Sequence, residues 1–136
     1  MKKINMVDLN GQYRKIRWQV NREIKKVIKS SSFINGPIVK EFQKNLQEYL
    51  NVRHVIPCAN GTDALQIALM ALDLKKGDEI ITTNFSFAST IEVILLLGLK
   101  PVIVDIDPRT FNIDPSLIEN KITERTKVII LSLIHI

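Results

Sequence analysis

The fold of this chain is decided by the stretch Ala59-Asn60-Gly61-Thr62-Asp63-Ala64-Leu65, which joins an apolar run to a helix through a glycine flanked by hydroxyl and amide side chains. Upstream, residues 54–58 (His-Val-Ile-Pro-Cys) predict a short buried strand. Downstream, apolar side chains recur at helical spacing at Leu65, Ala68, Leu69 and Leu72. The stretch therefore predicts a junction from strand to helix, as found in α/β proteins.

The same junction is a candidate phosphate site. Gly61 lets the backbone approach an anion, Thr62 adds a hydroxyl donor, and the N–H groups of the first helical turn carry the positive end of the helix dipole. A simpler interpretation is a capped helix without a ligand. Asn60, Thr62 and Asp63 are all common at helix starts, and the Asp63 carboxylate can satisfy the dipole by itself. From these residues alone, both interpretations stay open.

Two helices are expected before this junction. In the first, one face is apolar and the other is basic, and Ser30-Ser31-Ser32 then interrupts the pattern. Pro37 is suited to the first position of the second helix, which follows Asn35-Gly36. The apolar positions of the two helices are Ile16, Val20, Ile24, Val27, Ile28, Val39, Phe42, Leu46 and Leu50.

After residue 54 the pattern changes to alternating strands and helices. We expect strands at 54–58, 79–83, 101–105 and 127–134, and helices at 62–73, 88–97 and 115–121. This alternation predicts an α/β fold in which a mostly parallel sheet is flanked by helices, preceded by the two N-terminal helices. Asp107-Pro108 predicts the start of a turn after the third strand.

The composition is that of a globular domain, with 136 residues, 46% hydrophobic and 24% charged. The net charge of +5 raises the possibility of nucleic-acid binding. The early basic residues, however, occupy the polar face of an amphipathic helix, and no stacking aromatic pattern accompanies them. We therefore expect no nucleic-acid partner, with a phosphate-bearing small substrate or an acidic partner as alternative explanations for the charge.

No apolar run approaches the ~20 residues that span a bilayer, and the start does not resemble a signal peptide. We therefore expect a cytoplasmic protein without a membrane partner. The single cysteine, Cys58, falls in the first predicted strand and is expected to be a buried, inert thiol. His54 and His135 have no partners at ligand spacing, so we expect no metal site.

Polar and aromatic residues gather where the predicted strands end. In open parallel sheets, ligands bind beyond these carboxyl ends. Phe85 and Phe87 follow the second strand, and an aromatic ring beside a phosphate site suits a flat aromatic cofactor. The alternative is that both rings only fill space between the loop and the sheet.

Five motifs together resemble one family, the DegT/DnrJ/EryC1/StrS sugar aminotransferases, from about Ile4 to Ile130. They are Val7-Asp8-Leu9-Asn10-Gly11-Gln12-Tyr13, Phe33-Ile34-Asn35-Gly36-Pro37, the 59–65 stretch, Phe85-Ser86-Phe87-Ala88-Ser89-Thr90, and Val104-Asp105-Ile106-Asp107-Pro108 through Asn112-Ile113-Asp114-Pro115. Each motif is weak alone, and their order and spacing make the resemblance specific.

The resemblance implies the N-terminal part of a fold-type-I large domain that binds pyridoxal 5'-phosphate (PLP). It assigns Gly61, Thr62 and Asp63 to the cofactor phosphate, with Asp63 offering its N–H, and Phe87 to the face of the pyridine ring. Gly36 and Pro37 are assigned to the nucleotide-sugar pocket. Tyr13, in an opening typical of members that aminate the sugar at C3, joins them. The domains implied are a helical segment at 1–52 and a partial PLP-binding domain at 53–130.

The same resemblance implies transamination of a nucleotide-linked keto-sugar, with glutamate as the usual donor, by a homodimer. The Schiff-base lysine and the aspartate that pairs with the pyridine nitrogen are implied beyond residue 136, so we expect this chain alone to be inactive. Residues 131–136 depart from the family pattern and are interpreted as a non-native tail, with no role for His135. The alternatives are a PLP-dependent nucleotide-sugar dehydratase of the same fold, or a non-catalytic cofactor-binding or interaction module.

Overall fold

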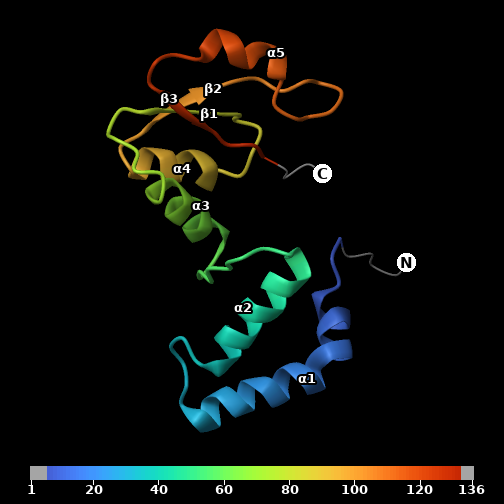
Figure 1. Cartoon of the computed structure of the whole chain (residues 1–136). Helices are drawn as coiled ribbons and strands as arrows, with labels where there is room; N and C mark the ends of the chain where they lie inside the picture. Colours follow the sequence, from blue (N-terminus) through green and yellow to red (C-terminus); the bar gives the residue numbers. More distant parts are fainter. Residues whose placement is uncertain (1–5, 133–136) are drawn as a thin grey trace, which may run out of the picture. The chain divides into compact units, whose positions relative to one another are not determined.

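A computed structural model of the chain describes residues 6–132 and divides the chain into two compact units, residues 1–57 and 58–136 (Figure 1). The sequence placed this boundary at residue 52. The predictions for His135 and for residues 133–136 of the expected tail lie outside the described residues. The two units are described separately below.

The first unit begins with α1 (Leu9–Ser30), which is capped by the side chain of Asp8. The Asp8 carboxylate accepts a hydrogen bond from the N–H of Gly11 at 2.9 Å. A Cβ at Gly11 would collide with this carboxylate, so the glycine allows the cap to close. The helix ends at Ser31, whose φ of 51° is left-handed.

The second helix, α2 (Pro37–Leu50), starts with proline at its first turn, as predicted. The preceding residue, Gly36, is buried, and a Cβ on it would overlap the carbonyl oxygen of Ser32. The loop therefore requires glycine at this position for its own packing. Asn51, at a φ of 52°, ends the helix.

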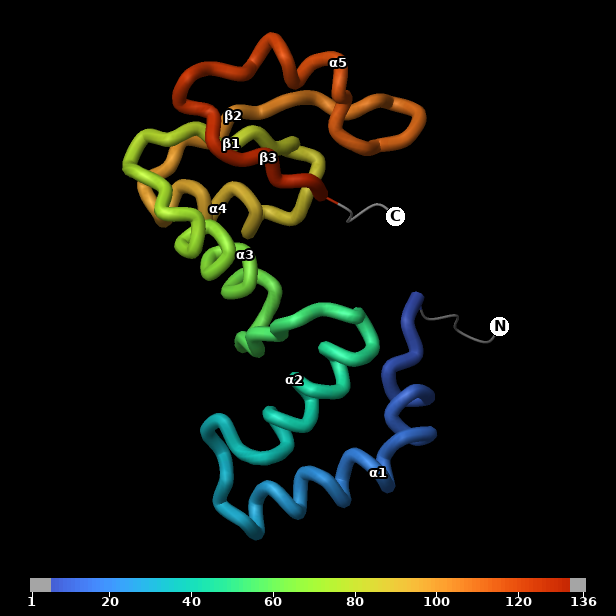
Figure 2. The backbone as a smooth tube through the Cα atoms, in the orientation of Figure 1, coloured from blue at the N-terminus to red at the C-terminus, as the bar shows by residue number. Residues whose placement is uncertain are grey.

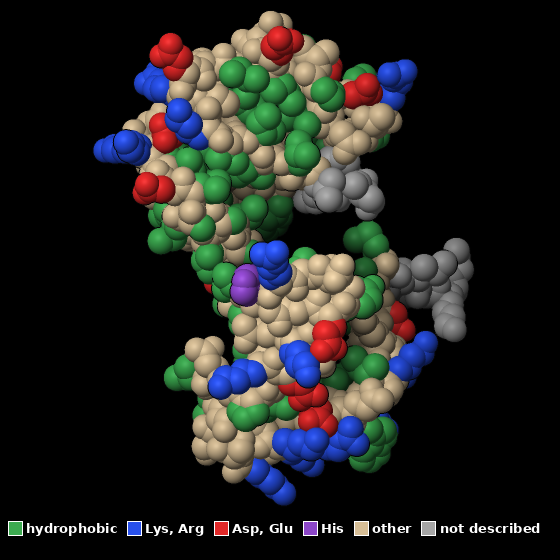
Figure 3. Space-filling view, viewed as in Figure 1, with side chains coloured by type: hydrophobic (Ala, Val, Ile, Leu, Met, Phe, Trp, Pro, Cys, Tyr) green, Lys and Arg blue, Asp and Glu red, His purple; other side chains and the backbone are tan. Residues whose placement is uncertain are grey.

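The amphipathic pattern of α1 has the expected polar face, since its Lys and Arg side chains are exposed. Figure 3 shows basic and acidic side chains interspersed over the visible face of this unit. The apolar face, in contrast, is not covered within the unit. Neither α1 nor α2 contains a buried residue, and Ile24 and Ile28 are both more than half exposed.

The strand predicted at 54–58 is wrong, because these residues form no strand. A strand exists only where its backbone groups pair with a neighbouring strand, and none of the described strands pairs with this segment. One carbonyl group of this segment and that of the preceding residue accept hydrogen bonds from side chains of α2 instead. Gln43 Nε2 donates to the carbonyl of Val55 at 2.9 Å, and Gln47 Nε2 donates to that of Arg53 at 2.7 Å.

The burial predicted for Cys58 is also wrong, because the thiol is exposed. Outside a sheet, the residue has no layer of side chains to cover it. Its Sγ donates to the carbonyl of Asn60 at 3.4 Å.

The second unit is a parallel sheet with helices, which confirms the predicted α/β class (Figure 2). The order of its strands is β2 (Lys100–Ile103), β1 (Glu79–Thr82), β3 (Thr126–Ile129). Most elements are slightly shorter than predicted, and the strand predicted at 127–134 is half as long within the described residues and begins one residue earlier. They are α3 (Gly61–Met70), β1 (Glu79–Thr82), α4 (Ser89–Leu96), β2 (Lys100–Ile103), α5 (Pro115–Ile118), the 3-10 helix η1 (Glu119–Lys121) and β3 (Thr126–Ile129).

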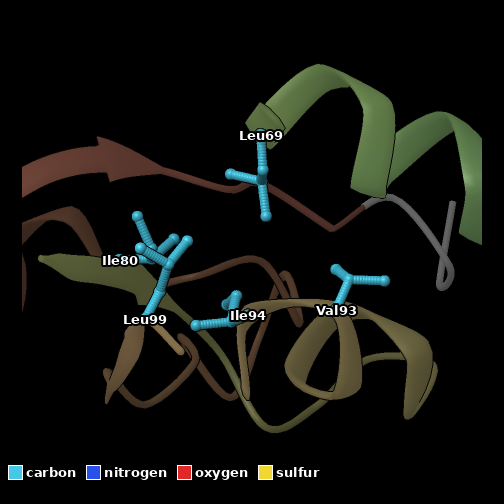
Figure 4. Close-up of a cluster of buried hydrophobic side chains, with 5 residues drawn as sticks. All are labelled: Leu69, Ile80, Val93, Ile94 and Leu99. Carbon is cyan, nitrogen blue, oxygen red and sulfur yellow. The ribbon is translucent and has the colours of Figure 1, made fainter. Parts of the chain in front are cut away.

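The central strand β1 supplies both faces of the core. Ile80 packs with residues of α3 and α4 and with the residue that precedes β2, in the cluster of Figure 4, which consists of Leu69, Ile80, Val93, Ile94 and Leu99. Ile81 points to the other face, where it packs with Val104 and Ile113. Successive strand residues face opposite sides, so one short strand holds two layers of apolar side chains.

A buried carboxylate stands at the amino end of β1. Glu79 accepts hydrogen bonds from the Thr123 hydroxyl at 2.6 Å and from Lys100 Nζ at 2.9 Å, and Arg125 lies 3.9 Å away. The Thr123 hydroxyl and the Lys100 ammonium together hold the pKa of Glu79 below its ordinary value. These contacts link β1 to the start of β2 and to the segment leading into β3.

Among the described residues, no helix is long and apolar enough to cross a lipid bilayer.

Glu79→Gln tests this buried cluster. The ionised carboxylate stabilises the fold above its ordinary pKa of 4.5, and this stabilisation is lost as the pH falls through the lower pKa of the folded state. The variant should therefore lower the melting temperature at neutral pH and flatten its decline on acidification. Melting curves across the acidic range measure this effect, with the exposed Glu119→Gln as control. Parallel curves for the wild type and Glu79→Gln would contradict it.

Candidate functional site

The candidate site lies at the carboxyl edge of the parallel sheet. Helices α3 and α4 connect to β1 from opposite ends of that strand, through residues 71–78 and 83–88. Each helix packs against the sheet core, and the short connections make both run opposite to the strand. The N-terminal ends of both helices therefore face the edge at which the strands end.

The first turn of α3 is closed by a reciprocal pair of side chains. Asn60 Oδ1 accepts from the N–H of Asp63 at 3.0 Å, and Asn60 Nδ2 donates to the Asp63 carboxylate at 3.1 Å. The Asp63 carboxylate is thus held by Asn60. The N–H that the sequence assigned to an anion is already engaged in this structure.

Three hydrogen-bond donors in this turn have no acceptor within residues 6–132. They are the N–H groups of Gly61 and Thr62 and the hydroxyl of Thr62. A Cβ at Gly61 would meet nothing within 4 Å. The described chain therefore does not itself require glycine here. Such donors at a helix N-terminus, beside open space at Gly61, suit the binding of a phosphate.

The loop after β1 carries the two phenylalanines of the predicted aromatic site. Its backbone is held at several points, since Thr83 Oγ1 accepts from the N–H of Phe85 at 3.2 Å and the carbonyl of Phe87 accepts from the N–H of Thr90 at 3.1 Å. Phe87 is 66% exposed, so within residues 6–132 it is not packed between the loop and the sheet.

Phe85 behaves differently from Phe87. Its ring stacks on Phe111 with a centroid separation of 5.7 Å and an interplanar angle of 27°. Sequence analysis did not single out Phe111. In the sequence, Phe111 is marked only by its place between the turn that begins at Asp107 and the motif that begins at Asn112. Neither feature predicts the direction of its side chain.

The residues predicted to bind substrate, Tyr13, Gly36 and Pro37, belong to the helical unit. Tyr13 donates its hydroxyl to Asn21 Oδ1 at 3.1 Å, within α1. Gly36 is buried in its own loop and Pro37 is exposed. Their assignment to a substrate pocket stays a prediction. Among the described residues, no group of His, Cys, Asp or Glu side chains is arranged to hold a metal ion.

Proteins of known activity resemble this chain along most of its length. It is 47% identical over 127 residues to the UDP-2-acetamido-2-deoxy-3-oxo-D-glucuronate aminotransferase of Pseudomonas aeruginosa, a match that covers 93% of this chain and 35% of that protein. The chain thus spans about a third of the length of the relatives that it matches.

Solved structures show the same fold. The Bacillus subtilis protein NtdA, determined with bound PMP cofactor, superposes with a TM-score of 0.85 and 37% identity, over 96% of this chain and 31% of that chain. The Escherichia coli GDP-4-keto-6-deoxy-D-mannose-3-dehydratase with bound hydrated PLP gives a TM-score of 0.74 at 30% identity, over 82% of this chain and 30% of that chain. The fold is therefore that of the fold-type-I enzymes, as the sequence predicted.

The two glycines Gly36 and Gly61 give a matched test of the site. Gly36→Ala should destabilise the chain by about 1–3 kcal/mol, because its Cβ overlaps a backbone carbonyl. Gly61→Ala should leave stability unchanged or raise it by up to about 1 kcal/mol, because alanine favours the helix and meets nothing. Thermal unfolding of both variants measures this difference. Equal losses of stability would show that Gly61 is required by the fold.

A sequence model that describes a whole protein family matches residues 14–135 of this chain. Together with the sheet, the helix N-terminus and the relatives described above, this match shows that the chain belongs to the DegT/DnrJ/EryC1/StrS aminotransferase family.

Proposed function

We propose that the first turn of α3 binds the phosphate of PLP. The observation that carries this proposal is a set of three donors, on Gly61 and Thr62, that have no hydrogen-bond partner within residues 6–132 and lie beside open space at Gly61. An anion placed there would receive two backbone N–H groups and one hydroxyl group, at the positive end of the α3 dipole. The PMP and PLP found in related structures support the choice of cofactor.

In this proposal, the N–H and the carboxylate of Asp63 are both controlled by the side chain of Asn60. Its N–H donates to Asn60 in the structure, so it can reach a phosphate only if the Asn60 side chain releases it. The bond from Asn60 Nδ2 keeps the Asp63 carboxylate beside the asparagine. Holding the carboxylate in this way limits its repulsion of a second anion.

Phe87 is proposed to cover one face of the cofactor ring. Its ring is exposed, at the same edge of the sheet as the N-terminus of α3, and the Phe87 carbonyl is fixed to α4. A phosphate held by α3 and a ring face held by Phe87 would together fix the position and the plane of the cofactor.

The complete protein is proposed to transfer an amino group, with glutamate as donor, to a nucleotide-linked keto-sugar, at C3. The 3-oxo sugar in the name of the Pseudomonas relative supports both the substrate class and the ring position. PLP, when bound, supplies the electron sink and the amino-group carrier that transamination needs. This chain supplies the phosphate and ring contacts.

The lysine and the aspartate required by this chemistry are proposed to lie outside this chain. Lys127 does not fit the role of the lysine, because its ammonium donates to the carbonyl of Glu124 at 2.9 Å, beside the amino end of β3. The complete protein is further proposed to be a cytoplasmic homodimer that binds neither nucleic acid nor membrane.

Thr62→Ala and Phe87→Ala test the cofactor contacts in the complete gene product. Loss of the Thr62 hydroxyl should weaken PLP binding roughly tenfold, as expected for one hydrogen bond to a charged group. Loss of the Phe87 ring should weaken it several-fold and change the circular dichroism of the bound cofactor. Thr62→Ser, which keeps the hydroxyl, is the control. Wild-type affinity in both alanine variants would remove the assigned roles.

The dehydratase is the second candidate, supported by the structural likeness to the Escherichia coli enzyme. The two functions differ in their products. With glutamate and a nucleotide-linked 3-keto-sugar, the proposed aminotransferase should give 2-oxoglutarate and an amino sugar, both measurable by mass spectrometry. A nucleotide-linked 4-keto-sugar is offered in parallel, because a 3-keto-sugar has no C3 hydroxyl to lose. Loss of its C3 hydroxyl without incorporation of nitrogen would favour the dehydratase. Cofactor binding without either product would favour the non-catalytic module.

A further inference from the structure

Phe111 has an unusual backbone conformation. Its φ is 59°, in the left-handed region that disfavours residues with bulky side chains. The other non-glycine residues with positive φ among residues 6–132 are serine, asparagine and aspartate: Ser31, Asn35, Asn51 and Asp73. A phenylalanine at such a position persists only where the surrounding structure enforces the conformation.

The turn that begins at Asp107 enforces it. The Asp107 carbonyl accepts from the N–H of Phe111 at 2.8 Å, and the Asp107 carboxylate accepts from the N–H groups of Arg109 at 2.7 Å and Thr110 at 3.2 Å. The hydrogen bond from the N–H of Arg109 is the main cause that lowers the pKa of Asp107 below its ordinary value. An antiparallel bridge between Ile106 and Ile113 closes the loop.

The result of this conformation is the contact with Phe85. The two rings are stacked, yet each is close to half exposed, 46% for Phe85 and 47% for Phe111. The contact is therefore not part of either buried core cluster. It joins the loop after β1 to the loop after β2, and both loops leave the same end of the parallel sheet (Figure 2).

Phe87 follows Phe85 by two residues, in the same loop. The hydroxyl of Ser86 bonds to that of Thr90 at 3.1 Å, and the Phe87 carbonyl accepts from the N–H of Thr90, so α4 holds one side of the loop. Phe111 holds the other side through Phe85. The loop is thus fixed on both sides of the exposed ring that is proposed to meet the cofactor.

We propose that Phe111 is a positioning residue for the cofactor contact, which fixes the loop at residues 83–88 through its stack on Phe85 and so sets the plane of the Phe87 ring. This inference rests on the proposed function. It explains why a phenylalanine occupies a backbone position that favours glycine, because the ring is required to hold Phe85 and its loop and not to fill a buried core.

The experiment measures PLP affinity, the circular dichroism of bound PLP, and the melting temperature without PLP, in the complete gene product. Phe111→Ala and Phe111→Gly both remove the ring, and only glycine relieves the backbone strain. Both should weaken PLP binding about 3- to 10-fold and alter the dichroism. Phe111→Gly should do so while melting at a higher temperature than Phe111→Ala. Phe111→Tyr, which keeps the ring, should restore wild-type binding.

Ile122→Ala is the matched control, because Ile122 is an exposed apolar residue of the same unit that precedes β3. It should bind PLP as the wild type does. Wild-type affinity and dichroism in Phe111→Ala and Phe111→Gly would overturn the inference. An equal fall in melting temperature in both, without recovery of PLP binding in Phe111→Tyr, would overturn it as well.

The inference and the proposed function fail in different ways. If the wild-type protein does not bind PLP, or Phe87→Ala binds it normally, the proposed function fails and the inference fails with it. If Thr62→Ala and Phe87→Ala weaken binding while the Phe111 variants match the wild type, the inference alone fails.

Discussion

The sheet unit depends on the complete burial of β1. All four of its residues, Glu79 to Thr82, are buried, and the strand pairs with β2 on one side and β3 on the other. Ile80 and Ile81 face opposite layers, so the helices on both faces pack against the same strand. Burial of each such side chain is worth about 1.5–3 kcal/mol, and no other strand of the described sheet supplies both layers to this extent.

The polar groups at the two ends of β1 differ in whether they are paired. At the amino end, the charge of Glu79 is balanced by Lys100, Arg125 and the Thr123 hydroxyl. At the carboxyl end, the hydrogen-bond donors of Gly61 and Thr62 have no acceptor within residues 6–132, and Phe87 is exposed. Satisfied polar groups stabilise a fold, whereas unsatisfied ones are available to a ligand. This asymmetry separates the paired charges at one edge of the sheet from the residues proposed to bind the cofactor at the other.

The elements predicted correctly are those with strong local signals. The helices of the first unit follow from apolar spacing and from Pro37, and the three observed strands follow from short apolar runs. The prediction of a strand at 54–58 was wrong, although its apolar run is as clear as those of the observed strands. Strand formation depends on a pairing partner that local sequence does not reveal. The exposure of Cys58 has the same origin.

The sequence by itself predicted the parallel α/β class, because helix caps, glycines and hydrophobic periodicity act over a few residues. The resemblance of its five motifs to one family indicated the family and the residues proposed to hold the phosphate. Only the tertiary structure decided which donors of the α3 turn have no partner within residues 6–132 and that Asn60 engages Asp63. It alone revealed the Phe111 ring on Phe85, from a residue 26 positions further along the sequence. Contacts of this kind depend on how the ends of separate strands are brought together, and no short stretch of sequence encodes that.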